Sequence, residues 1–114
     1  MANIKIVESL ITQIKKKFNT SEANKILDFI ELLETSPKKG KVLGTVGGIV
    51  IKELKYKSFR FYFITDGFKL KCYDEKSLID LLIKFVRMSD KKSQQKTIEE
   101  IRTILQTLGP KGFI

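Results

Sequence analysis

The sequence predicts an α+β fold: an N-terminal helical hairpin packed on a mostly antiparallel sheet of about four strands, followed by a C-terminal helix. Two observations lead to this class. Apolar residues recur at helical spacing near both ends of the chain, and a β-branched and aromatic run rich in turn signals fills the middle. The length of 114 residues fits one domain, so we expect a single unit over residues 1–114.

Two helical stripes occupy the first third of the chain. The first runs from about Lys5 to Phe18 and repeats apolar residues at steps of three and four. Thr20 or Ser21 can cap a second helix that continues to about Glu34. It ends before Ser36-Pro37, because proline disfavours helical geometry in the residue ahead of it.

Strands and turns alternate through the middle of the chain. Gly47-Gly48 and Asp66-Gly67 are turn signals. The run before Asp66 repeats phenylalanine at every second position from Phe59 to Phe63, which is the period of a strand. We therefore expect strands over Val42–Val46, Ile49–Lys55, Ser58–Thr65 and Phe68–Tyr73.

The last part of the chain closes the fold. SLIDLL, residues 77–82, fits either one helical turn or the start of a strand, and we favour a helical turn followed by a strand from about Leu82 to Met88. Ser89 or Asp90 can then cap a helix that reaches Leu108. Gly109-Pro110 stops this helix.

The composition excludes several kinds of chemistry. The chain has no histidine and one cysteine, so Cys/His metal sites, histidine acid–base catalysis and an internal disulfide are excluded. We expect no cofactor and no metal, and we interpret Cys72 as a buried thiol within a strand. No apolar run reaches membrane-spanning length and the N-terminus lacks a signal-peptide core, which predicts a cytoplasmic protein.

The positive charge is concentrated in the middle of the chain. The net charge is +9, of which residues 38–92 carry +8, residues 1–37 carry zero and residues 93–114 carry +1. Such a concentration favours an anionic partner, such as nucleic acid or an acidic protein segment. The alternative is a solvated, lysine-rich surface without a specific partner.

A basic cluster lies on the two central strands. Lys52, Lys55, Lys57 and Arg60 fall within nine residues, on strands that would hold them rigidly enough to contact a phosphate backbone. The two-residue period places Glu53 on the same face as Lys55 and Lys52 on the opposite face. Lys52 is therefore the member least expected at a phosphate bound by Lys55.

The ordered set of motifs resembles the RelE/ParE toxin superfamily, closest to its HigB-like and archaeal RelE-like branches. The likeness covers about Leu10 to Leu105. It rests on a two-helix start and on segments that this chain carries in order: Leu43-Gly44, Gly47-Gly48, Glu53-Leu54-Lys55, Phe59-Arg60-Phe61-Tyr62-Phe63, and Phe85-Val86-Arg87 through Lys91-Lys92.

The resemblance implies the toxin of a type II toxin–antitoxin system. Such a toxin enters the ribosomal A site and cuts mRNA by attack of a ribose 2′-hydroxyl on the adjacent phosphate. The expected partners are a cognate antitoxin, the ribosome and mRNA, without membrane or metal. The alternative is a non-catalytic RNA- or ribosome-binding module, or a ParE-like inhibitor, on the same fold.

The resemblance also implies which residues act. Lys55, Arg60 and Arg87 would hold the scissile phosphate, with bidentate geometry at Arg60. Glu53 would be the general base, although a salt bridge to a neighbouring lysine is an equal alternative.

Residues outside this set are expected to contact RNA: Lys57, Lys91, Lys92 and Phe113. The alternative for Lys91-Lys92 is a solvated helix start. Many relatives carry a C-terminal tyrosine or histidine, and this chain has neither residue type after Tyr73. Phe113 can stack on a base but cannot donate a proton.

Overall fold

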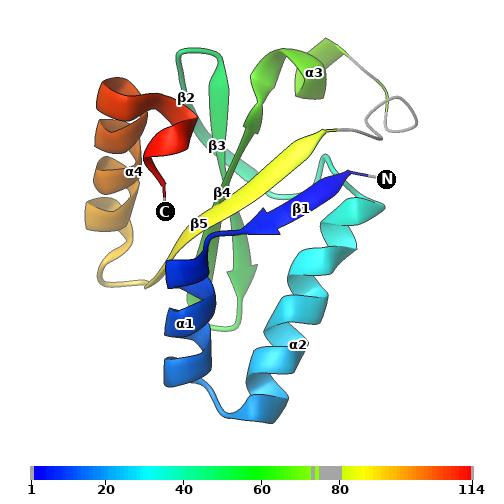
Figure 1. The fold of residues 1–114 in the computed structure, drawn as a ribbon, viewed down its shortest axis with the longest axis vertical. Coiled ribbons are helices and arrows are strands. Elements are labelled where there is room, and N and C mark those ends of the chain that lie inside the picture. The colour runs from blue at the N-terminus through cyan, green and yellow to red at the C-terminus, as the bar shows by residue number, and fades with distance from the viewer. Residues whose placement is uncertain (1, 73, 75–80, 114) are drawn as a thin grey trace.

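A five-stranded mixed sheet lies between two layers of helices in the part of the chain that the computed structural model describes, residues 2–72, 74 and 81–113 (Figure 1). The strand order is β1-β5-β4-β3-β2. The elements are β1 (Asn3–Ile6), α1 (Glu8–Lys17), α2 (Thr20–Glu31), a 3-10 turn η1 (Leu32–Glu34), β2 (Lys41–Val46), β3 (Ile49–Tyr56), β4 (Phe59–Asp66), α3 (Gly67–Cys72), β5 (Leu82–Asp90), α4 (Gln94–Leu108) and a second 3-10 turn, η3 (Gly109–Gly112). The predicted α+β class is confirmed, whereas the order of elements and the number of strands differ from the prediction.

The helical hairpin α1–α2 covers one face of the sheet. Its buried residues are Leu10, Ile14, Ala23, Ile26 and Ile30. Two aromatic rings of the hairpin contact the central strands: Phe18 meets Phe59 edge-on at 5.0 Å between centroids, and the ring centroids of Phe29 and Tyr56 lie 5.5 Å apart. Asn19 caps α2 by accepting a hydrogen bond from the backbone N–H of Glu22. Both helices are present, although their bounds differ from the prediction: α1 starts at Glu8, and α2 is capped one residue earlier and ends at Glu31.

The chain begins with a strand, which corrects the prediction of a helix from Lys5. β1 pairs in parallel with β5, and Ile6 lies opposite Phe85. The backbone N–H of Val7 donates to the carbonyl of Phe85, and α1 starts only at the next residue. This pairing joins residues almost eighty positions apart, so the periodicity of neighbouring residues could not predict it. Because β1 runs parallel to β5, the sheet is mixed.

The strands β2 to β5 form an antiparallel meander that agrees with four predicted strands to within about two residues. β2 is an edge strand. The β2–β3 turn places Gly47 and Gly48 at φ of +55° and +83°, a conformation that favours glycine. The β3–β4 turn places Lys57 at φ +54°, in the left-handed region.

The predicted strand Phe68–Tyr73 is wrong, because α3 occupies Gly67–Cys72. The Asp66 side chain accepts a hydrogen bond from the backbone N–H of Lys69, which caps a helix instead of closing a hairpin. Cys72 therefore ends a short helix and does not lie within a strand. The helical turn predicted for residues 77–82 falls mostly outside the described residues.

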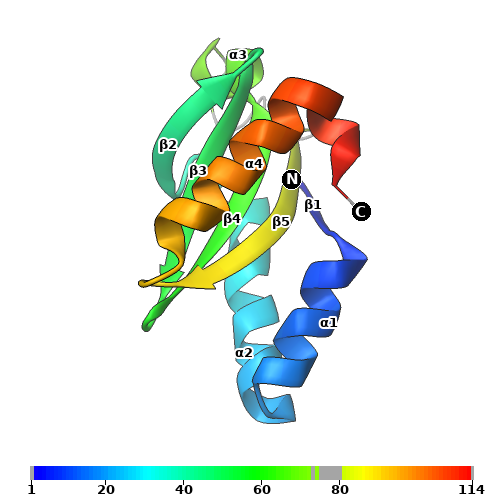
Figure 2. The same cartoon turned by 90° about the vertical axis from the view of Figure 1, so that its left-hand side faces the viewer.

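The helix α4 crosses the other face of the sheet (Figure 2). It buries Ile98, Ile101 and Leu105 and starts after Ser93, later than predicted, because Ser89 and Asp90 are the last residues of β5. η3 then turns the C-terminal segment back over the sheet.

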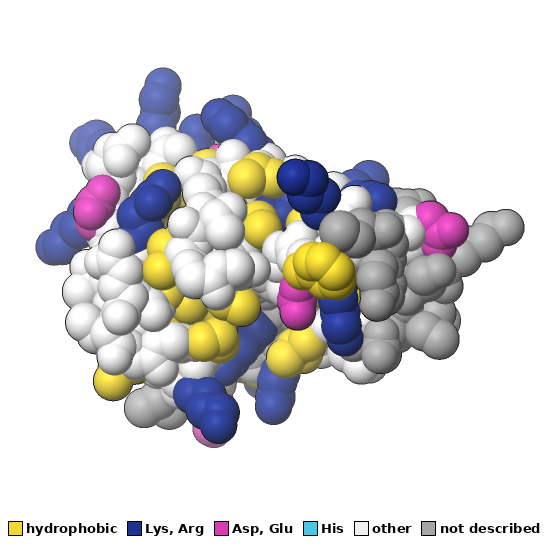
Figure 3. Space-filling model, turned by 90° about the horizontal axis from the view of Figure 1, so that it is seen from above, with side chains coloured by type: hydrophobic (Ala, Val, Ile, Leu, Met, Phe, Trp, Pro, Cys, Tyr) yellow, Lys and Arg dark blue, Asp and Glu magenta, His cyan; other side chains and the backbone are white. Residues whose placement is uncertain are grey.

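The end of the molecule nearest α3 carries both apolar and basic groups. Seen from above, hydrophobic side chains are exposed near the centre of this end, and lysine and arginine side chains lie around them (Figure 3). Within the described residues, no helix is long and apolar enough to cross a membrane.

Candidate functional site

The sheet register brings the four predicted catalytic residues to one face. Lys55 lies opposite Arg60, and Glu53 lies opposite Tyr62, which in turn lies opposite Arg87. Residues paired directly across strands share a face, and so do residues two apart on one strand. Glu53, Lys55, Arg60 and Arg87, which we call the charged cluster, therefore occupy two adjacent rows beneath and beside α4.

Glu53 and Arg60 form a largely buried ion pair. Arg60 Nε lies 3.2 Å from Glu53 Oε1, and the two side chains are 12% and 8% exposed. Although the distance is that of an ion pair, the angle is not that of a hydrogen bond, so Oε1 is buried without a hydrogen-bond partner. The alternative reading of Glu53 as a salt-bridge residue is thus realised with an arginine, and the carboxylate keeps unused acceptor capacity.

Arg87 is held by α4 and by the C-terminal segment. Its Nε donates to Glu100 Oε1, and its Nη1 donates to the Val86 carbonyl at 2.7 Å. The Phe113 ring, 4% exposed, lies 5.3 Å from the guanidinium carbon. In this structure Phe113 therefore stacks on Arg87 and presents no free ring to a base.

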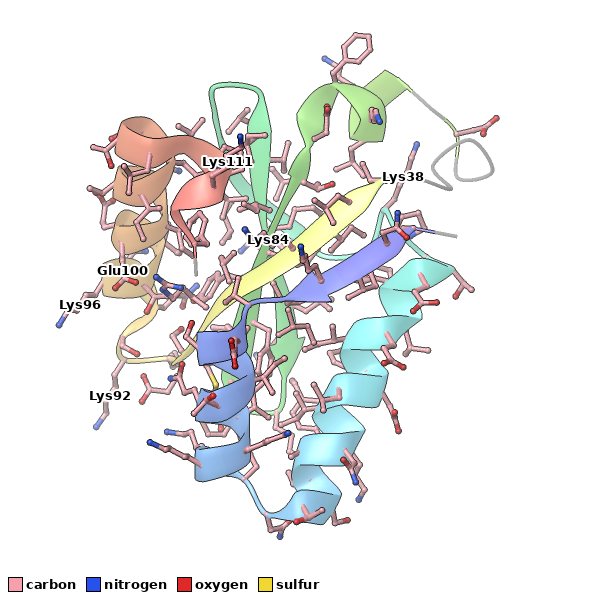
Figure 4. The ribbon with its side chains drawn as sticks, in the orientation of Figure 1. Lys38, Lys84, Lys92, Lys96, Glu100 and Lys111 are labelled. Carbon is pink, nitrogen blue, oxygen red and sulfur yellow. The ribbon has the colours of Figure 1, made fainter. Side chains whose placement is uncertain are left out.

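Lys84 anchors the segment that carries Phe113. Its ammonium donates to the carbonyls of Pro110 at 3.2 Å and Phe113 at 3.3 Å. The labelled Lys84 lies beside this segment, and Glu100 lies on α4 facing β5 (Figure 4). The charged cluster is thus partly covered by groups of its own chain.

Tyr62 lies on the same face as the charged cluster but was not among the predicted site residues. It is fully buried between Glu53 and Arg87 in the register, and its hydroxyl is hydrogen-bonded to that of Ser89 at 2.7 Å. Burial is the main cause that raises the pKa of Tyr62, so the hydroxyl stays protonated at neutral pH. The sequence does contain a signal for Tyr62: it follows Arg60 by two residues in the run FRFYF, so both side chains point to the same face of the strand.

Cations from three separate segments meet at the end of the sheet that carries the β3–β4 turn. Lys17 Nζ of α1 lies 5.2 Å from the centroid of the Phe59 ring, and Phe59 pairs with Asp90 at the end of β5. The exposed residues Lys17, Lys55, Lys91 and Lys92 form what we call the basic end. Lys92 projects outward before α4 (Figure 4). Lys17 was missed, because lysines at a helix C-terminus are already explained by the helix dipole.

Lys57, a predicted RNA contact, is already paired. Its ammonium donates to Glu22 Oε1 of α2 at 2.8 Å, and Tyr56 donates to the same oxygen at 2.9 Å. The hydrogen bond from Lys57 is the main cause that lowers the pKa of Glu22. Lys57 thus lies beside the basic end with its charge balanced by a carboxylate.

The described residues contain no group of three or more His, Cys, Asp or Glu side chains that could hold a metal ion. Comparisons with known proteins found no matching protein-family model, no matching curated protein and no matching solved structure. The function is therefore inferred from the chemistry of the charged cluster and the basic end.

Proposed function

We propose that this protein is the toxin of a type II toxin–antitoxin system and cuts mRNA on the ribosome, as its resemblance to RelE-type toxins implies. One observation carries the proposal: a buried carboxylate, Glu53, contacts Arg60 on a sheet face that also holds Lys55 and Arg87. A proton acceptor beside several phosphate-binding cations is the set that 2′-hydroxyl attack on a phosphate requires.

Each member of the charged cluster has a place in this reaction. Glu53 takes the proton of the 2′-hydroxyl, the 2′-oxygen forms a bond to phosphorus, and the bond from phosphorus to the 5′-oxygen breaks. Arg60 and Lys55 stabilise the extra negative charge on the phosphate. Lys55, which is exposed, is the cluster's proton donor to the leaving 5′-oxygen. Arg87 joins them once phosphate replaces its contacts with Glu100 and Phe113.

The basic end supports RNA as the partner. Lys17, Lys91 and Lys92 lie around the end of the sheet where Lys55 and Arg60 are found, so a phosphate backbone can follow these cations into the charged cluster. Contacts of this kind are electrostatic and weaken as counterions compete.

The test is cleavage of a defined mRNA by the purified protein in the presence of ribosomes. Lys55→Ala is the sharpest variant, because this lysine is exposed and its loss leaves no buried charge. We expect this variant to cleave at least tenfold more slowly while its thermal unfolding is unchanged. A tenfold loss of rate corresponds to about 1.4 kcal/mol of lost transition-state stabilisation. Lys25→Ala, an exposed lysine on α2, is the matched control. Intact mRNA at stoichiometric wild-type protein would contradict the proposal.

A second candidate function is RNA or ribosome binding without cleavage, or ParE-like inhibition through protein contacts. The burial of Glu53 and the contacts of Arg87 favour it, because both groups are occupied whereas the lysines of the basic end are exposed. Salt-sensitive binding that leaves the RNA intact, and that Glu53→Gln does not alter, would support this function over the first.

A further inference from the structure

A pocket of about 530 Å³ lies between the sheet and α3, on the opposite side of the sheet from the charged cluster. Its floor follows from the register: Lys52 on β3 lies between Val42 on β2 and Phe63 on β4, and the strand period turns this row away from Glu53. Residues of α3 and the loop residue Lys38 complete the lining. α3, which forms one wall of the pocket, lies at the end of the molecule seen in Figure 3, and Lys38 lies below α3 in Figure 4.

Lys52 contributes a buried ammonium group to this pocket. The residue is 2% exposed, and its Nζ donates to the carbonyl of Lys38 at 2.8 Å and lies 5.8 Å from the centroid of the Phe63 ring. Within the described residues, no carboxylate lies at ion-pair distance from Lys52. Burial lowers the pKa of Lys52, which is the response of a cation without a counter-charge.

Apart from the neutral polar residue Thr45 and two glycines, the remaining lining is basic and apolar. Lys38 and Lys71 are exposed lysines, whereas Phe68 is 67% exposed and Val42 is 59% exposed beside the opening. Among the described residues that line the pocket, none is acidic. A ligand here therefore meets positive charge at the floor and rim, and apolar surface between them.

We propose that this pocket binds a small organic carboxylate with an apolar body, whose carboxylate pairs with the ammonium of Lys52. An ammonium has three N–H donors and the Lys38 carbonyl uses one, so two remain for a carboxylate. A phosphate dianion would need more buried donors than one lysine supplies. The volume is within the usual range for small-molecule sites, roughly 300–1,000 Å³. This inference does not depend on the proposed RNA cleavage, because the two sites use different faces of the sheet.

The experiment uses sodium hexanoate as the probe and hexan-1-ol as its uncharged counterpart. Each is titrated into the isotope-labelled full chain, and amide shifts are followed by NMR. We expect hexanoate to shift residues of β2, β3 and α3 around the pocket, and to bind at least tenfold more tightly than hexan-1-ol. Lys52→Met should weaken hexanoate binding at least tenfold, whereas Lys39→Met, an exposed lysine of the same loop, should not.

The pKa of Lys52 provides a second readout that does not depend on a variant folding. Direct NMR titration of its ε-methylene group should show that hexanoate raises this pKa toward the ordinary value. An unchanged pKa would overturn the proposal, and so would equal binding by the Lys52→Met protein or by hexan-1-ol. Displacement of hexanoate by an equal concentration of inorganic phosphate would overturn the assignment to carboxylates.

Discussion

Substitution of Arg60 should lower the free energy of unfolding, because it leaves the buried carboxylate of Glu53 without its counter-charge. Arg60→Met takes away the cation 3.2 Å from a carboxylate oxygen that has no hydrogen bond and is largely buried. Losing one partner of a buried ion pair typically costs about 3–5 kcal/mol, and the residual exposure of Arg60 places the expected loss near the lower limit, about 3 kcal/mol at pH 7. For a domain of this size that loss lowers the melting temperature by roughly 12 °C.

A second substitution separates the ion pair from the loss of packing. The double variant Arg60→Met/Glu53→Gln has no buried charge at this position, so we expect it to recover to within about 1 kcal/mol of the wild-type free energy of unfolding. RNA cleavage by the Arg60→Met variant must be assayed at a temperature at which this variant is folded, because the single variant can lose activity through unfolding.

The comparison of the two variants provides the decisive measurement. Urea unfolding at pH 7, followed by circular dichroism, gives the free energy of unfolding of the wild type, of Arg60→Met and of the double variant. A loss below about 1 kcal/mol for Arg60→Met, or a double variant no more stable than the single one, would refute the reasoning.

Three further outcomes are expected. Lys52→Met should be about 1 kcal/mol more stable than wild type at pH 7, because it removes a buried charge. The pKa of Lys52 is lowered in the folded protein, so this difference in stability should shrink as the pH of the urea unfolding experiment is raised toward 10.5. A difference that does not change with pH would contradict a buried charge. Phe113→Ala should cost about 3 kcal/mol in the same assay, and a loss below 1 kcal/mol would show that the ring is not packed on Arg87. Replacing Lys17, Lys91 and Lys92 by alanine should reduce the slope of log binding constant against log salt for single-stranded RNA by about 2, roughly 0.7 per lost phosphate contact, and an unchanged slope would remove the basic end from the RNA interface.

Much of the charged cluster could be predicted because it depends on local rules. The two-residue period of a strand places Glu53 with Lys55, and a tight hairpin brings Arg60 opposite Lys55. Arg87 is different, since its row depends on β5 pairing with β4 through a register shift near Tyr62. Its contacts with Glu100 and Phe113 depend on where α4 packs, which no pattern within β5 records.

Periodicity, together with turn and cap signals, located α1, α2, α4 and the four strands of the meander to within a few residues, because these signals are properties of neighbouring residues. The tertiary structure was needed wherever the partner is distant in the chain. β1 exists through its pairing with β5. α3 is a different case, because its cap at Asp66 is local, and the turn signal Asp66-Gly67 fits a hairpin as well as a helix start. Lys52 also required the tertiary structure. Strand alternation assigns it to one face of the sheet, but its burial results from the packing of α3 and of the loop that contains Lys38. Burial and long-range pairing depend on the sum of many contacts, and short windows of sequence do not contain them.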